Sequence, residues 1–426
     1  MTENKTNFLL PVLLALVVLG GCKSNKISAS ASDDGVVHGI KYDKVPKGMD
    51  LPSNMVYIPT GSFTLGSNES GGAGTTSVSV NGFWMDKYEV TNAQYHQFVN
   101  WVRDSTAAMI LGYVHVSKEG DTAVDWSKAK KINYKDDDIQ QRLSSMMLPS
   151  QDLLNDQPEL DPSKLIYRAK GYDFNAAAHH PDQPRKNFIY SYDVPIYPDT
   201  LVWIKDFDYS YNVSMARDYF ENAAYAQYPV VGVNWRQATA FAHWRTYYLN
   251  QYLGRKKLTV QNAYRLPTEA EFEYAARGGH NNYLYPWGNY LKNAEGCMMA
   301  NFKNGKGNYT DDGALYPARV DSYLPNDFGL YNIAGNVAEW TATSYVNGYQ
   351  AYDNDFNPNI YINATDQDSQ DKKRKTVRGG SWKDPAVGIQ VSSRSYEYMD
   401  SARSYIGFRC VIDIPPGTPK KIISFV

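Results

Sequence analysis

Residues 335–340 read Gly-Asn-Val-Ala-Glu-Trp, and they follow a long segment, residues 283–325, that is crowded with Gly, Asn, Asp and Pro. Such residues favour turns and loops over helices and strands. Gly335 in addition permits a backbone angle that other residues rarely adopt. The stretch therefore predicts a fold with long ordered loops, which need something that holds them in place.

Three helix starts lie upstream of this stretch. Each is a capping box, in which the N-cap residue and the residue three positions later satisfy free backbone N–H groups at the start of the helix. The N-cap residues are Thr91, Asn234 and Thr268. The spacing of apolar residues behind them predicts helices, the first over residues 92–103.

The composition excludes some classes of protein. The chain has 426 residues, with 43 Lys and Arg against 45 Asp and Glu, and 43% of its residues are hydrophobic. This balance is typical of globular proteins. Without a basic run to neutralise phosphates, nucleic acid is not an expected partner. Aromatic residues make up 14%, so a mixed, loop-rich chain is favoured over a helical bundle.

The N-terminus predicts a lipoprotein signal peptide over residues 1–21. Lys5 supplies the positive charge, and residues 8–18 are apolar but too few to span a bilayer, which takes about 20 residues. Cys22 follows Leu-Gly-Gly, which resembles the lipobox of bacterial lipoproteins. We therefore expect cleavage before Cys22 and acylation of its thiol.

The segment after the signal peptide is expected to be a tether. Residues 22–50 begin with small and polar residues that have little to bury, which indicates a flexible link between the lipid and the folded domain. No later window holds 18 uncharged apolar residues, so the chain is expected to be anchored to a membrane rather than to span it. Residues 415–426 are expected to be a C-terminal tail.

Residues 104–228 differ from the rest of the chain. They are rich in Asp, Tyr and Pro and lack sustained hydrophobic periodicity, which indicates an insertion or an interaction arm. A second small domain is the alternative. His179 and His180 lie in this segment and, with no ligand partners nearby, are expected at the surface rather than on a metal ion.

Seven motifs together resemble the formylglycine-generating enzyme (sulfatase-modifying factor) family, in which they occur in the same order. They are EVTNAQY (89–95), PVVGVNW (229–235), YRLPTEAE (264–271), YPWG (285–288), GNVAEW (335–340), RGGSW (378–382) and GFR (407–409). The resemblance implies one domain over residues 51–414, interrupted by the insertion. It also implies an α+β, loop-rich fold related to C-type lectins, with loops stabilised by calcium.

Two calcium loops follow from the resemblance. Calcium takes six to eight oxygen ligands from carboxylates, amides and backbone carbonyls. In the first loop, side chains of Asn332 and Glu339 and carbonyls of Gly335 and Val337 match the family's ligands. The residues that match in the second loop are Asn301, Phe302, Asp312 and Ala314. The alternative for each loop is an ordinary Asx turn. Both calcium sites would be structural.

The chain departs from the family at its catalytic site. The family's enzymes oxidise a substrate cysteine with oxygen, using Cu(I) held by two thiolates, and Cu(I) selects such soft ligands. The matching positions here are Asp384 and Ile389, and no Cys occurs between Ser381 and Arg409. The sequence therefore predicts that copper is not bound and that the family's reaction is absent.

The remaining cysteines and charged residues suggest no replacement chemistry. Cys297 and Cys410 are available for one disulfide in an oxidising periplasm. No nucleophile elbow, phosphate loop or zinc motif is present. Arg394 and Arg409 could bind an anion, although pairing with buried carboxylates is the more common role of buried Arg. The chain is therefore predicted not to be an enzyme.

Within the family, the lipobox, the FVNWVRDS run at 98–105 and the missing cysteine pair resemble the gliding-motility lipoproteins GldK, called PorK in non-gliding relatives. The resemblance implies an outer-membrane lipoprotein that faces the periplasm. It would form a homo-oligomeric ring with a GldN/PorN-type protein, as a scaffold of the type IX secretion system and gliding machinery. The alternatives are a GldJ-like motility lipoprotein, or a sulfatase-modifying or other enzyme with unrecognised residues.

Overall fold

In this computed structural model, residues 36–37, 40–41, 54–67, 74–116, 122–153, 157–207, 213–258, 261–305, 307, 309–348 and 354–414 are described. The predicted signal peptide with Cys22, most of the tether and the C-terminal tail lie outside them. Within the described part, two four-stranded sheets form the centre of the fold. Short pairs of strands surround them, the first of which is Val36–Val37 (β1) with Ile40–Lys41 (β2).

The first four-stranded sheet is antiparallel throughout, in the order β11-β16-β6-β3. The second has the order β14-β13-β12-β15, in which only β12 and β15 are parallel. The strands are β3 (Met55–Ile58), β6 (Phe83–Asp86), β11 (Tyr264–Arg265), β12 (Ala338–Ser344), β13 (Arg374–Arg378), β14 (Arg394–Tyr398), β15 (Ile406–Gly407) and β16 (Val411–Asp413), with a separate hairpin of β4 (Gly61–Ser67) and β5 (Gly74–Val80).

Three helices pack against these sheets, and each begins where the capping boxes predict. They are α1 (Asn92–Ile110), α7 (Trp235–Arg255) and α8 (Glu269–Arg277), and the reciprocal hydrogen bonds of the capping box are present in all three. The predicted end of α1 at Arg103 is wrong, because the helix continues to Ile110. Its last turns bury Ala107 and Ala108, and residues of the inserted segment pack around that end.

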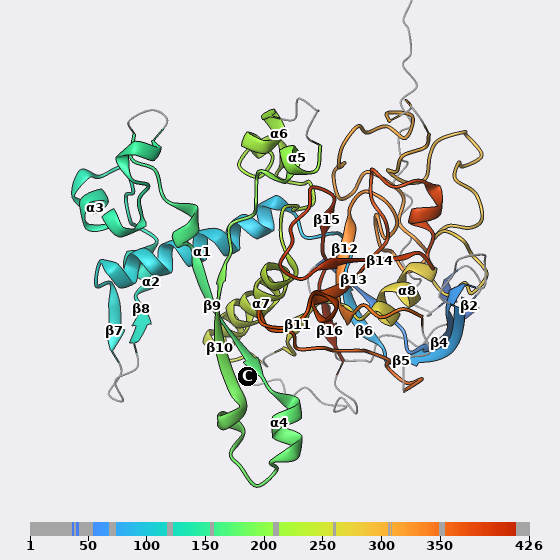
Figure 1. Ribbon diagram of the computed structural model, residues 1–426, viewed down its shortest axis with the longest axis horizontal. Helices are drawn as coiled ribbons and strands as arrows, with labels where there is room; N and C mark the ends of the chain where they lie inside the picture. Colours follow the sequence, from blue (N-terminus) through green and yellow to red (C-terminus); the bar gives the residue numbers. More distant parts are fainter. Residues whose placement is uncertain are drawn as a thin grey trace, which may run out of the picture.

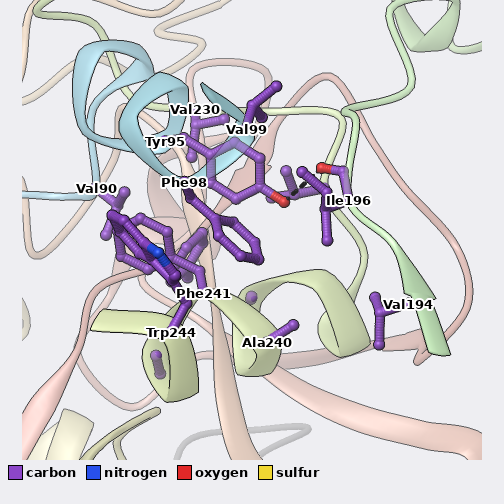
Figure 2. Packing of buried hydrophobic residues seen from close by; sticks show 14 of the residues in the cluster. Val90, Tyr95, Phe98, Val99, Val194, Ile196, Val230, Ala240, Phe241 and Trp244 are labelled. Carbon is purple, nitrogen blue, oxygen red and sulfur yellow. Dashed lines mark hydrogen bonds between the residues drawn. The ribbon is translucent and has the colours of Figure 1, made fainter. Parts of the chain in front are cut away.

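The main core joins the helices, the sheets and the insertion. Figure 2 shows Tyr95 and Phe98 of α1 facing Phe241 of α7, with Val194 and Ile196 of the inserted segment beside them. The Tyr95 hydroxyl donates a hydrogen bond to the Ile196 carbonyl oxygen at 2.8 Å. Because these residues share one apolar cluster, part of the insertion belongs to the core of the domain.

The inserted segment has more regular structure than its composition predicts. It forms two β-hairpins and several short helices around α1, and the second hairpin projects from the body of the molecule with α4 at its end (Figure 1). The elements are β7 (Val114–Val116), β8 (Thr122–Val124), α2 (Trp126–Ala129), α3 (Asp137–Arg142), β9 (Ile166–Tyr172), α4 (Phe174–His179), β10 (Ile189–Pro195), α5 (Val202–Lys205) and α6 (Val213–Asp218).

The expectation of long ordered loops is confirmed. The described residues of 283–325 form turns, bends and isolated bridges, without helix or strand. Short 3-10 turns occur elsewhere, at Ser144–Met146, Ser150–Asp152, Pro162–Lys164, Arg185–Phe188, Ala223–Tyr225, Gln370–Lys373 and Ala386–Ile389.

Candidate functional site

Asp384 and Ile389, for which the sequence predicts a match to copper-binding cysteines, serve the local structure. The Asp384 carboxylate accepts hydrogen bonds from Ser381, at 2.9 Å from the backbone N–H and 2.6 Å from the hydroxyl. Ile389 is fully buried in an apolar cluster with Tyr285 and Phe302. Neither side chain is a soft ligand of the kind that Cu(I) selects.

A glycine fixes how these two positions approach each other. Gly380 has a φ of +66°, and a Cβ atom there would collide with the carbonyl oxygen of Gly388 and lie 2.9 Å from Ile389. Only glycine fits such a close approach in this conformation. The Gly-Gly-Ser-Trp turn is therefore packed directly on the segment that contains Ile389.

The insertion covers the surface next to this turn. The Trp382 ring lies 6.3 Å from Trp203 of α5 and 5.4 Å from Phe207, measured between ring centroids. Asp206 at the end of α5 accepts hydrogen bonds from the backbone N–H and the hydroxyl of Ser404, both at 2.8 Å. Trp203 and Trp382 are only 1% and 5% exposed, so this aromatic surface is closed to solvent.

The buried arginines form ion pairs, as the sequence indicated for Arg394 and Arg409. Arg394 donates two hydrogen bonds of 2.7 Å to Glu269 of α8. Arg409 contacts the Glu339 carboxylate at 2.7 Å. Arg378 joins Glu269 to Glu273, which also binds Arg277. The acidic residues of α8 thus have structural partners, and these arginines are committed to carboxylates.

In the first predicted calcium loop, the side-chain oxygen of Asn332 has no hydrogen-bond partner, whereas the Glu339 carboxylate already binds an arginine. The Asn332 amide nitrogen donates to the carbonyl oxygen of Val320 at 3.1 Å, whereas its Oδ1 is buried without a partner. The Glu339 carboxylate is held by Arg409. Gly335 has a φ of +81°, and a Cβ there would lie 2.5 Å from the carbonyl oxygen of Asn301, so the two loops pack together.

In the second loop, the predicted alternative of an Asx turn is present. The Asp312 carboxylate accepts hydrogen bonds from the backbone N–H of Phe302 at 2.7 Å and of Ala314 at 3.2 Å. Burial raises the pKa of Asp312, and no described Lys, Arg or His forms an ion pair with it. The Oδ1 atom of Asn301 is buried without a partner.

The donor set of both loops fits calcium. A buried polar atom without a hydrogen bond costs about 1–3 kcal/mol, and amide oxygens are ligands that Ca²⁺ accepts. Asn332 and Asn301 each present such an oxygen, and Asp312 adds a buried carboxylate. Glu339 fits least well because Arg409 already neutralises it. Within the described ranges, no group of three or more His, Cys, Asp or Glu residues is arranged to hold a metal.

Sequence reasoning missed Glu89 as a site residue. Glu89 is fully buried, and its Oε1 accepts a hydrogen bond from the amide of Asn336 at 2.8 Å. Burial raises the pKa of Glu89 to about 8, although the nearby Arg409 opposes that shift. A carboxylate directly before the buried Val90 and the N-cap Thr91 was the available signal, because an isolated acid in a buried run needs a partner.

The predicted disulfide between Cys297 and Cys410 is wrong. Cys410 is a free, fully buried thiol in the main core, where its backbone N–H donates to Asp86 at 3.0 Å. Burial raises the pKa of the Cys410 thiol to about 12. Cys297 lies in the loop next to Met298, which packs in a different cluster, so the two cysteines belong to separate parts of the fold.

Two further findings concern the insertion and the membrane. His179 and His180 are exposed, as the sequence predicted. None of the helices in the described residues is both long enough and apolar enough to cross a membrane.

The chain belongs to the family of sulfatase-modifying factor enzyme 1-like domains, whose model matches residues 42–414. It is 29% identical over 405 residues to the formylglycine-generating enzyme of Mus musculus, covering 92% of this chain and 82% of that protein. The inactive C-alpha-formylglycine-generating enzyme 2 of Bos taurus is 36% identical over 200 residues, which cover 45% of this chain and 53% of the relative.

Among solved structures, PvdO from Pseudomonas aeruginosa aligns over 84% of this chain and 94% of its own, with a TM-score of 0.46 and 18% identity. The family match confirms both the predicted resemblance and the predicted α+β domain. The family thus contains proteins named as enzymes and proteins named as inactive.

Proposed function

We propose that this chain is a non-catalytic member of the family that acts as a structural scaffold. The observation that carries the proposal is the use of Asp384 and Ile389. One is bound to its own turn and the other fills an apolar cluster. Cu(I) requires soft ligands, and Cys410, with its raised pKa and complete burial, is not a replacement thiolate.

The proposed setting is the outer membrane. The lipobox supports a lipid anchor at Cys22 and a position facing the periplasm. The resemblance to GldK and PorK supports a homo-oligomeric ring with a GldN/PorN-type protein in the type IX secretion and gliding machinery. Substitution of Cys22 by Ala is expected to move the protein from the membrane fraction to the soluble fraction, as measured by fractionation and immunoblotting.

The projecting β9–β10 hairpin is the proposed docking element. Its strands expose Ile189 (50%) and Tyr190 (37%), and exposed aromatic residues are enriched at interface cores. A pocket of about 650 Å³ lies at its end, lined by Tyr172, Ala177, His180, Pro181, Arg185 and Phe188. These features support binding of a protein partner at the end of the hairpin.

Crosslinking and mass spectrometry of the native membrane complex test the scaffold proposal. A stoichiometric periplasmic partner, with crosslinks from Lys186 near the hairpin end, is the expected result. A protein isolated without any partner would contradict it. A GldJ-like role would give crosslinks to other motility proteins without the GldN/PorN-type partner.

The enzyme alternative is favoured by the similarity to formylglycine-generating enzymes, and it requires its own test. Purified protein is incubated with copper, oxygen and a cysteine-containing sulfatase peptide, and formylglycine is measured by mass spectrometry. We expect no product, and the same for the double variant Cys297→Ser, Cys410→Ser. Product from both proteins would show that other residues perform the reaction and would overturn the scaffold proposal.

We also propose that calcium stabilises the two loops. The side chains of Asn332, Asn301 and Asp312 would hold it, together with backbone carbonyl oxygens of the same loops. A chelator is expected to lower the melting temperature of the wild-type protein, and calcium in excess to restore it. In the double variant Asn301→Ala, Asn332→Ala, melting should be the same with and without chelator.

A further inference from the structure

One buried chain of hydrogen bonds connects the two predicted calcium loops. Asn301 donates from Nδ2 to Oδ1 of Asn336 at 3.2 Å. Asn336 donates from Nδ2 to Oε1 of Glu89 at 2.8 Å, and Asn332 donates from Nδ2 to Oε2 of the same carboxylate at 3.3 Å. All four residues, hereafter the Glu89 network, are at most 5% exposed.

These hydrogen bonds determine which atom of the Asn332 and Asn301 amides has no partner. The Nδ2 atom of Asn332 faces Glu89 and the carbonyl oxygens of Val320 and Arg319, at 3.1 and 3.4 Å. Its Oδ1 must therefore point the other way, where it is buried without a partner. The Nδ2 atom of Asn301 is bound to Asn336 and to the carbonyl oxygen of Tyr316 at 2.9 Å, which leaves the Oδ1 of Asn301 unpartnered as well.

Asn336 cannot reverse its own amide without losing this arrangement. Its Oδ1 accepts a hydrogen bond of 2.7 Å from the backbone N–H of Ala318, and its backbone N–H donates to the carbonyl oxygen of Asn301 at 2.8 Å. A flipped amide would place a donor against the Ala318 N–H and an acceptor against the Glu89 carboxylate. Both oxygens of Glu89 accept hydrogen bonds from asparagine Nδ2 atoms, so Glu89 sets the orientation of the whole chain.

We propose that Glu89 and Asn336 are positioning residues that couple the two calcium sites. Glu89 orients Asn332 directly and Asn301 through Asn336, so that each loop presents an amide oxygen to its own cation. Occupation of either site then favours the arrangement that the other site needs. This inference rests on the calcium sites proposed above.

Substitution Glu89→Gln tests the coupling, because it replaces one of the two accepting oxygens by an NH2 group, which would face the Nδ2 donor of one asparagine. Calcium binding to the chelator-treated full chain is measured by isothermal titration calorimetry. We expect the Kd to rise about tenfold or more at both sites, and Glu89→Asp, which keeps two carboxyl oxygens, to recover part of the affinity. Asn332→Ala should also raise the calcium Kd of the second loop, whose own residues it leaves unchanged.

The matched control is Asn326→Ala. Asn326 is also buried, but its amide binds the carbonyl oxygen of Ala275 and backbone N–H groups of its own turn, outside the Glu89 network. This variant should melt at a lower temperature and keep its calcium Kd within about twofold.

The possible failures are distinguishable. Wild-type affinity at both sites in folded Glu89→Gln would overturn the coupling and leave the calcium sites standing. If Glu89→Gln does not fold, an unchanged Kd at the remaining site of Asn332→Ala overturns the coupling in the same way. Wild-type protein that binds no calcium at millimolar concentration would overturn both proposals.

Discussion

At the scale of single residues, Ile389 is a core residue at a position where the family resemblance predicts a metal-binding cysteine. Its side chain is fully buried among apolar neighbours, so it contributes through the removal of apolar surface from water. A ligand position in an open site would instead tolerate smaller side chains. The free energy of unfolding therefore distinguishes the two roles.

Ile389→Ala is expected to lower the free energy of unfolding by about 2–5 kcal/mol, through lost apolar burial and the cavity that remains. Urea denaturation followed by circular dichroism measures the change. Val387, two residues earlier and 61% exposed, provides the control, and Val387→Ala should cost less than about 0.5 kcal/mol. Equal stability of Ile389→Ala and wild type would mean that position 389 is not part of the core.

Lys375 is a buried cation without a carboxylate partner among the described residues. It is 1% exposed, donates hydrogen bonds to Ser344 Oγ at 3.0 Å and the Ile362 carbonyl oxygen at 3.1 Å, and lies 4.3 Å from the centre of the Trp235 ring. Burial lowers the pKa of Lys375 from 10.5 to about 8. The folded state therefore loses this proton at a lower pH than the unfolded chain.

The sign of the resulting pH dependence follows from linkage. Between pH 8 and 10.5 the unfolded state binds more protons at Lys375, so this residue's contribution to stability rises with pH. The difference in unfolding free energy between wild type and Lys375→Met should increase by about 3 kcal/mol over that range. Guanidinium titrations at several pH values measure it, with the exposed Lys372→Met as control. Parallel pH profiles for all three proteins would contradict the burial of a charge at Lys375.

The sequence predicted that buried arginines pair with carboxylates, because this follows from a general rule. It did not predict contacts between residues that only the fold brings together. The pairing of Arg409 with a carboxylate follows from the cost of burying a charge, so it could be predicted without knowing the partner. Glu89 contacts Asn332 and Asn336 across 243 and 247 residues of sequence. No local pattern encodes such a contact, and the Glu89 network became visible only in the structure.

At the scale of elements, local signals were reliable where the element depends on local bonds. The capping boxes at Thr91, Asn234 and Thr268 predicted three helix starts because both partners of each bond lie within four residues. The end of α1 was missed although a local stop is present. Gly112 follows the C-cap Leu111 with a φ of +74°, and the backbone N–H of Tyr113 donates to the Ala108 carbonyl oxygen at 2.8 Å. The β9–β10 pairing was missed for a different reason, since its Tyr-rich and Asp-containing strands are largely exposed and lack strict alternation.

The position of α5, which covers Trp382, is expected to depend on the Asp206 carboxylate. Its carboxylate accepts hydrogen bonds from Ser404 and Arg403 and is 5% exposed, and loss of buried charged hydrogen bonds costs more than about 1.5 kcal/mol. Asp206→Ala should increase the hydrogen-exchange rate of the α5 amides about tenfold or more, with α8 unchanged. Asp193→Ala, which removes an exposed ion pair with Arg168, is the control and should leave α5 protected. Unaltered α5 exchange in Asp206→Ala would show that other contacts hold the element.

At the scale of the whole molecule, the insertion has two parts with different roles. Residues such as Leu143, Leu165 and Ile196 share the main apolar cluster with α1 and α7, so removal of all residues 104–228 is expected to unfold the domain. The outer end of the β9–β10 hairpin, residues 173–188, projects from the body (Figure 1). A test of partner binding must therefore remove the end of the hairpin and keep its base.

Replacement of residues 173–188 by Asn-Gly achieves this separation. Tyr172 and Ile189 face each other in the antiparallel register, and a two-residue Asn-Gly loop closes such a pair in the preferred type I′ turn. The base of the hairpin keeps Ala169 and Val194 in the core, so the melting temperature should fall by no more than about 4 °C. Co-purification of the proposed periplasmic partner should be lost, while the proposed lipid anchor at Cys22 should still hold the variant at the membrane. If partner binding survives in this folded variant, the docking surface must lie on another face, and the scaffold proposal would have to be rebuilt around the surface of α5 and α6.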